Sequence, residues 1–289
     1  METHVELKEI LEGLYATRSQ AHLANDPLSF CHRYPAPEDQ EVVGLIASSF
    51  AYGNVKIIKK TLATIFDTMG ESPRLFVERF DPKQGQRLYA GFKHRFNDGR
   101  DLCALLLAAR TMLRESGSIE KWLLRFHDQR REDLTETLAG FTAAVKSLDL
   151  SPVFGTAGIP VDSYFPFMFP SPASGSACKR LCMYLRWMVR PADGIDLGIW
   201  KGITPDKLVI PVDAHIQRIC RFLGLTHRKQ ADWRMACEIT RGLRELDPAD
   251  PVKYDFSICH LGISEGCDGK DRLKCLSCPI AGICSQGAS

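Results

Sequence analysis

The cysteines restrict what this chain can fold into more than any other feature. Five of the eleven lie within the last thirty-one residues, and four of these follow the pattern Cys-x7-Cys-x2-Cys-x5-Cys. So many thiols in a short polar segment indicate one metal centre, since free cysteines of folded proteins usually lie in apolar sequence. The four candidate ligands are Cys267, Cys275, Cys278 and Cys284.

The spacing of these cysteines favours an iron–sulfur cluster. Four thiolates in one loop can hold a [4Fe-4S] cluster, and the Cys-x2-Cys step puts two sulfurs on one side of it. Four cysteines also hold a tetrahedral zinc, but zinc ribbons usually pair two Cys-x2-Cys knuckles and this segment contains one. We therefore expect a [4Fe-4S] cluster, with structural zinc as the alternative.

The rest of the chain has the pattern of an all-α protein. Strand-like alternation is essentially absent, and apolar residues recur at helical spacing. The segments concerned are 6–19, 42–50, 57–69, 102–114, 119–125 and 134–148. Five prolines and several glycines then interrupt the pattern between 151 and 176. Such density of helix breakers predicts a long ordered connection between two helical lobes, or a loop that lines an active site.

We expect four parts along the chain. An N-terminal helix over 1–39 packs on the cluster lobe, and a helical, barrel-like lobe follows over 40–150. Residues 151–266 contain the Pro-rich connection, a hairpin-like segment and the catalytic helices, and residues 267–289 form the cluster loop. A chain of 289 residues, 45% of them hydrophobic, is long enough to bury a substantial core.

Charge and hydropathy exclude several classes of protein. The chain has 37 Lys and Arg against 35 Asp and Glu, so it is no histone-like nucleic-acid binder, although a local basic face is allowed. Its longest apolar runs, such as 102–109, are shorter than the roughly 20 residues of a membrane span. The first residues lack the apolar stretch of a secretory signal. We expect a cytoplasmic protein without membrane contact.

The segment 210–225 predicts a capped helix. Asp213 stands at the N-cap position before apolar residues at helical spacing, and Gly224 stands where a helix ends. A capping carboxylate at the edge of a cleft is also fixed and ionised for chemistry. His215 and Arg218 follow on the exposed side, where they either contact phosphate or are solvated.

The segment Pro211-Val-Asp-Ala-His215 and the cysteine pattern together resemble the helix-hairpin-helix DNA glycosylases of the endonuclease III type. Those proteins carry a similar Val-Asp-Thr-His segment and a C-x6-C-x2-C-x5-C cluster loop. This chain has Ala214 in place of the threonine and one more residue in the first cysteine gap. The resemblance is strong over 208–289. It implies a two-lobed helix-hairpin-helix glycosylase-like fold with a C-terminal [4Fe-4S] cluster loop.

Over nearly its whole length the chain also resembles the DUF2400 family, whose function is unknown. The family's recurring pieces are Lys-Arg-Leu, Leu-Arg-Trp-Met-Val-Arg, Asp-Leu-Gly-Ile-Trp and Asp-Pro-x-Lys-Tyr-Asp-Phe. In this sequence they lie at 179–181, 185–190, 196–200 and 250–256.

The glycosylase resemblance implies catalytic roles for Lys179 and Asp213. In bifunctional glycosylases a lysine just after the hairpin attacks the sugar C1′, and the aspartate of the Val-Asp segment assists departure of the base. Lys179 is the matching lysine, one turn into a helix that we expect to open at 174–181, and it would form a Schiff base. A surface contact to phosphate is the alternative.

Two features depart from the endonuclease III pattern. The usual Leu-Pro-Gly-x-Gly hairpin is Ser171-Pro-Ala-Ser-Gly175 here. The step from Lys179 to Asp213 spans 34 residues, which is longer than in endonuclease III. A comparably long gap resembles the archaeal 8-oxoguanine glycosylases and implies an oxidised purine as substrate.

Further side chains are expected at a DNA interface. The candidates for phosphate contact are Lys270, Arg272 and Lys274 of the cluster loop, with Arg180, Arg186, His215 and Arg218. The resemblance places Gln40 and Glu41 near the base pocket, and Tyr52 and Asn54 near the duplex as wedge residues. Each is alternatively a solvated side chain, a helix cap or a turn residue.

These patterns together predict a base-excision DNA repair glycosylase with AP lyase activity. We expect a monomer that binds double-stranded DNA and flips a damaged base into a cleft, because C1′ is blocked inside the stack. A non-catalytic iron–sulfur protein that binds damaged or structured nucleic acid is the alternative. A redox-sensing regulator is a third reading.

Overall fold

The computed structural model describes residues 2–17, 20–263 and 266–286. Within these ranges most residues lie in helices, and two strands of two residues each form the one described sheet. The all-α prediction is therefore confirmed. The predicted helical segments correspond to α1, α3, α4, α7, α8 and α9, whose bounds follow.

The N-terminal half begins with three helices of very different lengths and continues through a small β-hairpin. Its first elements are α1 (Glu2–Thr17), α2 (Gln20–Leu23), the 3-10 helix η1 (Pro27–Arg33), α3 (Pro37–Phe50), α4 (Val55–Met69), α5 (Pro73–Glu78) and α6 (Pro82–Leu88). The hairpin and the helices after it are β1 (Lys93–His94), β2 (Asn97–Asp98), α7 (Gly99–Ser116), α8 (Ile119–Leu124) and α9 (Thr135–Lys146).

The Pro-rich connection is ordered as short helices. The elements from there to the C-terminus are α10 (Ser151–Phe154), α11 (Phe165–Met168), the 3-10 helix η2 (Pro172–Ser174), α12 (Lys179–Val189), the 3-10 helix η3 (Pro205–Lys207), α13 (Ala214–Phe222), α14 (Trp233–Leu246), α15 (Asp255–Ile263) and α16 (Arg272–Cys275). Pro occupies an early position in α10, α11, η2 and η3, where a missing N–H costs no helical hydrogen bond.

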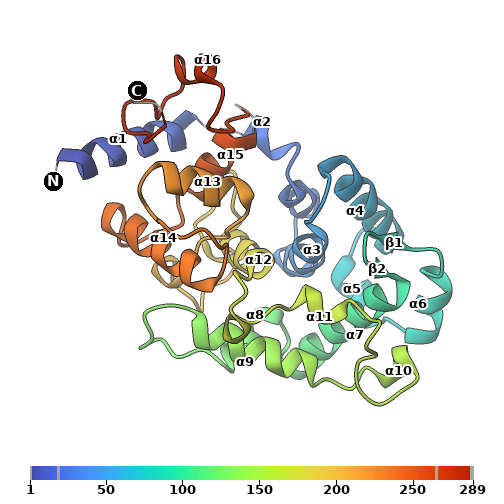
Figure 1. The fold of residues 1–289 in the computed structure, drawn as a ribbon. Coiled ribbons are helices and arrows are strands. Elements are labelled where there is room, and N and C mark those ends of the chain that lie inside the picture. Colours follow the sequence, from blue (N-terminus) through green and yellow to red (C-terminus); the bar gives the residue numbers. More distant parts are fainter. Residues whose placement is uncertain (1, 18–19, 264–265, 287–289) are drawn as a thin grey trace.

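Helices α3 and α12 pack closely at the centre of the molecule. A Cβ atom on Gly44 of α3 would lie 2.6 Å from Cε of Met188 and 3.0 Å from Cε2 of Tyr184, so glycine leaves room for these two side chains of α12. The Tyr184 hydroxyl of α12 donates to the carbonyl of Glu41 at 3.1 Å. Figure 1 shows α4 to α7 on one side of this pair and α1, α13, α14 and α15 on the other.

The N-terminal helix packs against α15, far from it in sequence. Lys253 Nζ lies 2.7 Å from Glu12 Oε1, and the Tyr254 hydroxyl donates to the same oxygen at 2.6 Å. Desolvation raises the pKa of Glu12, but these partners outweigh it and lower the pKa below its usual value. The first helix therefore belongs to the same packed unit as the C-terminal helices.

A buried charge network crosses the core behind α12. Asp196 is fully buried between two arginines of α12, with Oδ1 3.2 Å from Arg186 Nε and Oδ2 2.5 Å from Arg190 Nη1. Arg186 also pairs with Asp255 at the start of α15, and Arg190 pairs with Asp250 at 2.9 Å. The network ties α12 to three segments that follow it in sequence.

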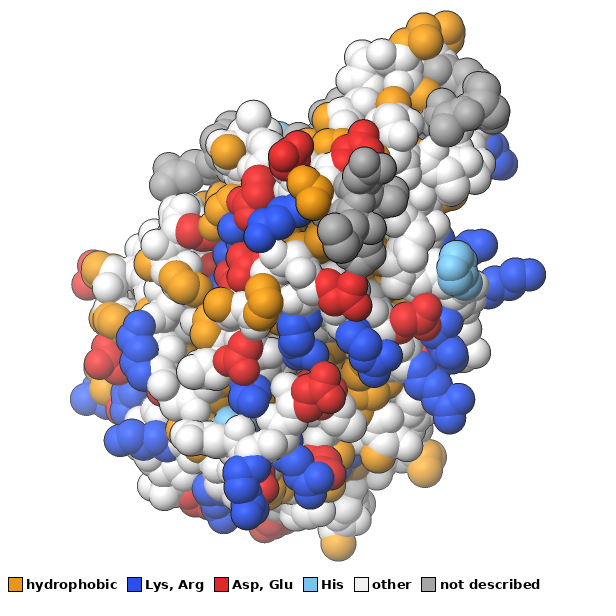
Figure 2. Space-filling model, turned by 90° about the vertical axis from the view of Figure 1, so that its left-hand side faces the viewer, with side chains coloured by type: hydrophobic (Ala, Val, Ile, Leu, Met, Phe, Trp, Pro, Cys, Tyr) orange, Lys and Arg blue, Asp and Glu red, His pale blue; other side chains and the backbone are white. Residues whose placement is uncertain are grey.

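The surface carries both charges in mixture. On the face drawn in Figure 2, Lys and Arg side chains alternate with Asp and Glu, and no broad area of one sign is present there. Among the described residues, no helix is both long enough and apolar enough to cross a membrane.

We expect Asp196→Ala to lower the free energy of unfolding by about 3 kcal/mol, because it leaves two buried arginines short of negative charge. Urea unfolding of the wild type and the variant measures this difference. The control is Asp128→Ala, which breaks the exposed 2.8 Å pair with Arg130 and should change the unfolding midpoint little. Equal losses in the two variants would contradict a special role for the buried network.

Candidate functional site

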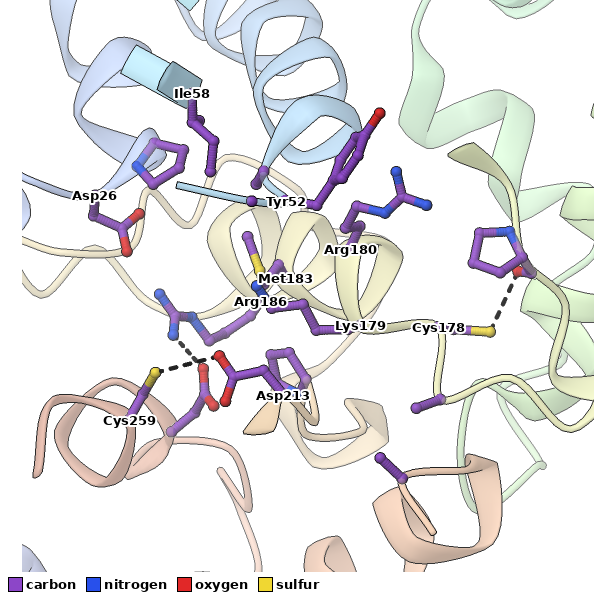
Figure 3. Close-up of a pocket in the computed structure, with 18 of the residues that line it drawn as sticks. Asp26, Tyr52, Ile58, Cys178, Lys179, Arg180, Met183, Arg186, Asp213 and Cys259 are labelled. Atoms are coloured by element: carbon purple, nitrogen blue, oxygen red, sulfur yellow. Dashed lines mark hydrogen bonds and ion pairs between the residues drawn. The ribbon is translucent and has the colours of Figure 1, made fainter. Parts of the chain in front are cut away.

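A cavity of 840 Å³ opens at the start of α12. Its walls come from the turn between α3 and α4, from α11 and α12, from the segment that precedes α13, and from α15. Lys179 and Asp213 both line it, and Figure 3 shows their side chains directed toward the same space. The structure thus brings together the two residues that sequence reasoning selected as catalytic.

Lys179 is the first residue of α12, so the helix opens later than the sequence predicted. Cys178 precedes it with φ of 49°, a left-handed conformation that ends the incoming loop sharply. Upstream, the Ser171 hydroxyl caps the short helix η2, and Gly175 ends it with φ of 77°. The Gly175 carbonyl accepts a hydrogen bond from Trp233 N at 3.1 Å, which anchors this turn to the start of α14.

Asp213 is the N-cap of α13, as predicted. Its Oδ1 accepts from the backbone N–H groups of His215 and Ile216 at 2.8 and 2.9 Å. Its Oδ2 is 3.7 Å from Sγ of Cys259 on α15 (Figure 3). One oxygen therefore caps the helix, and the other lies at the cavity wall with a thiol as its partner.

Sequence reasoning missed two residues at this wall. Cys259 is not one of the four predicted metal ligands, and the structure places it in the cavity lining. Burial raises the pKa of the Cys259 thiol well above its usual value, so the thiol stays protonated and donates a hydrogen bond to Asp213. Asp255, one turn before Cys259, also lines the cavity, and the Asp-Pro-x-Lys-Tyr-Asp-Phe segment was the signal for it.

The structure corrects the expectation that Arg180 and Arg186 are free to contact phosphate. Both are buried. Arg180 donates to the carbonyls of Ser49 and Phe167, and burial lowers its pKa to about 10. Arg186 is engaged by two aspartates of the buried network. Both guanidinium groups are therefore bound by protein partners, and a linear pattern of residues does not reveal these partners.

His215 and Arg218 form part of the contact between α13 and α15. A Cβ atom on Gly262 of α15 would lie 2.5 Å from Nδ1 of His215, so the imidazole packs directly on that backbone. Arg218 Nη2 is 3.1 Å from the same nitrogen. Both side chains are half-buried, and their packing role accounts for these contacts without DNA.

The expectation that Gln40 and Glu41 lie at the base pocket is corrected, because neither lines the cavity. Glu41 is buried and accepts from Glu120 N at 2.8 Å and from Trp200 Nε1 at 2.9 Å, so it caps α8. Burial raises its pKa above the usual value. Gln40 donates to the Tyr34 carbonyl at 2.9 Å.

The two predicted wedge residues differ in placement. Tyr52 lines the cavity, and its hydroxyl donates to the carbonyl of His94 at 3.0 Å. Asn54 is exposed and caps α4 through Lys56 N at 2.9 Å. Its neighbours Gly53 and Val55 line the cavity, so Asn54 stands at the rim.

The four predicted ligands gather in the C-terminal loop. Cys267, Cys275 and Cys278 line one small cavity of 90 Å³. Cys284 is buried and is not one of its lining residues. Burial raises the pKa of Cys278, and the other three thiols add to the effect, so all lie within electrostatic reach of it. Four thiols in one short loop fit the donor chemistry of an iron–sulfur cluster or zinc. Across the described ranges, no three His, Cys, Asp or Glu side chains already stand in metal-binding positions.

The loop rests on α13. A Cβ atom on Gly269 would lie 2.4 Å from the Phe222 ring, so the loop backbone packs directly on that side chain. Lys270 and Lys274 are exposed, and Lys274 Nζ donates to the Gly266 carbonyl at 3.1 Å. The side chain of Arg272 lies outside the described residues.

Asp255 should make stability depend on pH. Its burial, together with Asp213 and Asp196 nearby, outweighs Arg186 and raises its pKa to about 6. The folded protein then holds the proton of the Asp255 carboxyl more tightly than the unfolded chain does. The stabilisation that this proton gives to the folded state is therefore complete below pH 4 and is lost as the pH rises through 6. The unfolding free energy of the wild type minus that of Asp255→Asn should fall by about 2 kcal/mol between pH 4 and pH 7. A flat or rising difference would contradict this.

No curated protein and no solved structure matches this chain. The family described as "Protein of unknown function (DUF2400)" matches residues 26–264, which include α3, α12, α13 and the cavity residues Lys179, Asp213 and Cys259. The chain therefore belongs to the DUF2400 family.

Proposed function

We propose that this protein is a DNA base-excision glycosylase with AP lyase activity. The observation that carries the proposal is the shared cavity of Lys179 and Asp213, an amine and a carboxylate from distant segments. Its volume of 840 Å³ lies within the usual range of about 300–1,000 Å³ for small-molecule sites and accommodates a flipped nucleotide. The partner is double-stranded DNA with a damaged base, bound by a monomer.

In the proposed reaction Lys179 Nζ attacks C1′ of the flipped nucleotide. The C1′–N bond breaks, and its electron pair leaves with the base, which takes up a proton. The C1′–O4′ bond then opens to give an imine between Nζ and C1′. Loss of a proton from C2′ expels the 3′ phosphate and cuts the strand, and water finally hydrolyses the imine.

Asp213 would act through the oxygen that does not cap α13. That oxygen accepts a proton from the Lys179 ammonium, or stabilises positive charge on the sugar as the base departs. The cap and the Cys259 thiol hold the carboxylate in one orientation, so no reorganisation is needed during the reaction.

The four cysteines would hold a [4Fe-4S] cluster. Bound there, the cluster would supply the cross-links that keep this loop folded on α13. Lys270, Arg272 and Lys274 would then face the DNA backbone from a fixed loop. An oxidised purine as the damaged base is part of this proposal.

Lys179→Ala should abolish covalent capture of the protein by borohydride on a duplex with an abasic site. Borohydride reduces the imine to a stable amine, and alanine cannot form the imine. Gel analysis of trapped complexes measures this, and duplex affinity should stay within about twofold because no phosphate contact is removed.

The matched control is Lys201→Ala, which removes an amine that does not line the cavity and should leave trapping intact. Trapping that persists in Lys179→Ala would show that another amine is the nucleophile.

Asp213→Asn keeps the cap of α13, since an amide oxygen still accepts the hydrogen bonds from the two backbone N–H groups. It should slow turnover on a lesion duplex by about two to four powers of ten.

The purified protein should contain about four irons and four acid-labile sulfides per chain. Cys278→Ser should lose this iron and lower the thermal midpoint, whereas Cys237→Ser, outside the loop, should keep it. Iron and sulfide assays with visible absorption measure the content. Stoichiometric zinc in place of iron would contradict the cluster.

A further inference from the structure

Exposed aromatic rings gather in one patch beside the cavity. Among the described residues, the Phe, Tyr and Trp side chains that are more than 40% exposed are Phe96, Tyr164 and Phe167, at 49%, 45% and 44%. Phe96 comes from the β1–β2 hairpin, Tyr164 directly precedes α11, and Phe167 lies within α11, about seventy residues further along the chain. With Arg95 they are called the aromatic platform.

Each ring of the platform contacts a neighbouring ring. Phe96 and Tyr164 stack with centroids 5.2 Å apart and planes 20° from parallel. Phe167 meets Tyr52 edge-on at 5.3 Å, and both of these line the cavity. The platform is therefore continuous with the space that holds Lys179.

Arg95 adds an available positive charge. It sits at the hairpin turn with φ of 53°, and its guanidinium lies 5.5 Å from the Phe96 centroid and 5.9 Å from that of Tyr52. A Cβ atom on Gly53, whose φ is 99°, would lie 2.8 Å from Arg95 Cδ, so glycine leaves room for this side chain. Within the described ranges Arg95 makes no ion pair, and both Asp98 and Asp162 pair with Arg100.

We propose that the aromatic platform stacks an unpaired base of the DNA strand whose neighbouring nucleotide enters the cavity. Exposed rings with an arginine free for phosphate are the chemistry that holds unstacked bases without reading their sequence. This inference rests on the proposed function, because the nucleotide in the cavity positions the strand over the platform. It would give the protein a preference for DNA that is already locally unpaired over intact duplex.

The test uses single-stranded DNA that carries the fluorescent base 2-aminopurine. Wild-type protein should bind it and quench its fluorescence, since stacking on an aromatic ring quenches this base. The double variant Phe96→Ala/Tyr164→Ala should lose the quenching and bind at least tenfold more weakly. Arg95→Ala should weaken binding and reduce the salt dependence by about one phosphate contact.

Two control variants test whether the loss of binding is specific to the rings of the aromatic platform. Leu88→Ala removes an equally exposed apolar side chain from α6, outside the platform, and should bind as the wild type does. Phe96→Tyr keeps a ring and should retain the quenching. Circular dichroism melting of each variant establishes that it is folded before binding is compared.

Each outcome decides between the proposals. Unchanged binding and quenching in the double variant would overturn the proposal that the platform stacks a base, and would favour a protein as the partner of its rings. The glycosylase proposal would stand. Ring-dependent binding without borohydride trapping by the wild type would overturn the lyase activity and support the platform as a DNA surface. A wild-type protein that binds no DNA would overturn both.

Discussion

Buried ion pairs of Arg186 and Arg190 with Asp196 fix the position of α12 in the core. Removing these charges from water is costly, and only the mutual pairing offsets that cost. The network holds α12 against the segments around Asp196, Asp250 and Asp255. Because Lys179 begins α12 and Asp255 begins α15, the same network sets where the amine stands relative to the opposite wall of the cavity.

One carboxylate both caps a helix and lines the cavity in this protein. The carboxylate of Asp213 caps α13 with one oxygen and leaves the other to the cavity, where Cys259 holds it. A cap of this kind is rigid, because turning the carboxylate would break two hydrogen bonds to the backbone. The cavity thus has a fixed carboxylate on one wall, an amine on another, and exposed aromatic rings at its edge.

Periodicity and capping chemistry could be predicted because both depend on neighbours in sequence. The helices over 102–114 and 134–148 and the cap at Asp213 follow from spacing and residue type, and the structure has them. The partners of Arg180, Arg186 and Glu41 could not be predicted, for the opposite reason. Their partners, such as Ser49, Asp255 and Trp200, lie between 69 and 159 residues away, and no local pattern announces those contacts.

The all-α class, the positions of the main helices, the capping role of Asp213 and the grouping of four cysteines can be read from the sequence, since each depends on residues a few positions apart. Only the packing of distant segments places Lys179, Asp213 and Cys259 in one cavity and the exposed rings beside it. Those arrangements depend on how α12 packs against α3 and on the buried charges that join it to α15. Packing and desolvation act between segments far apart in the chain, and a linear pattern of residues does not contain their outcome.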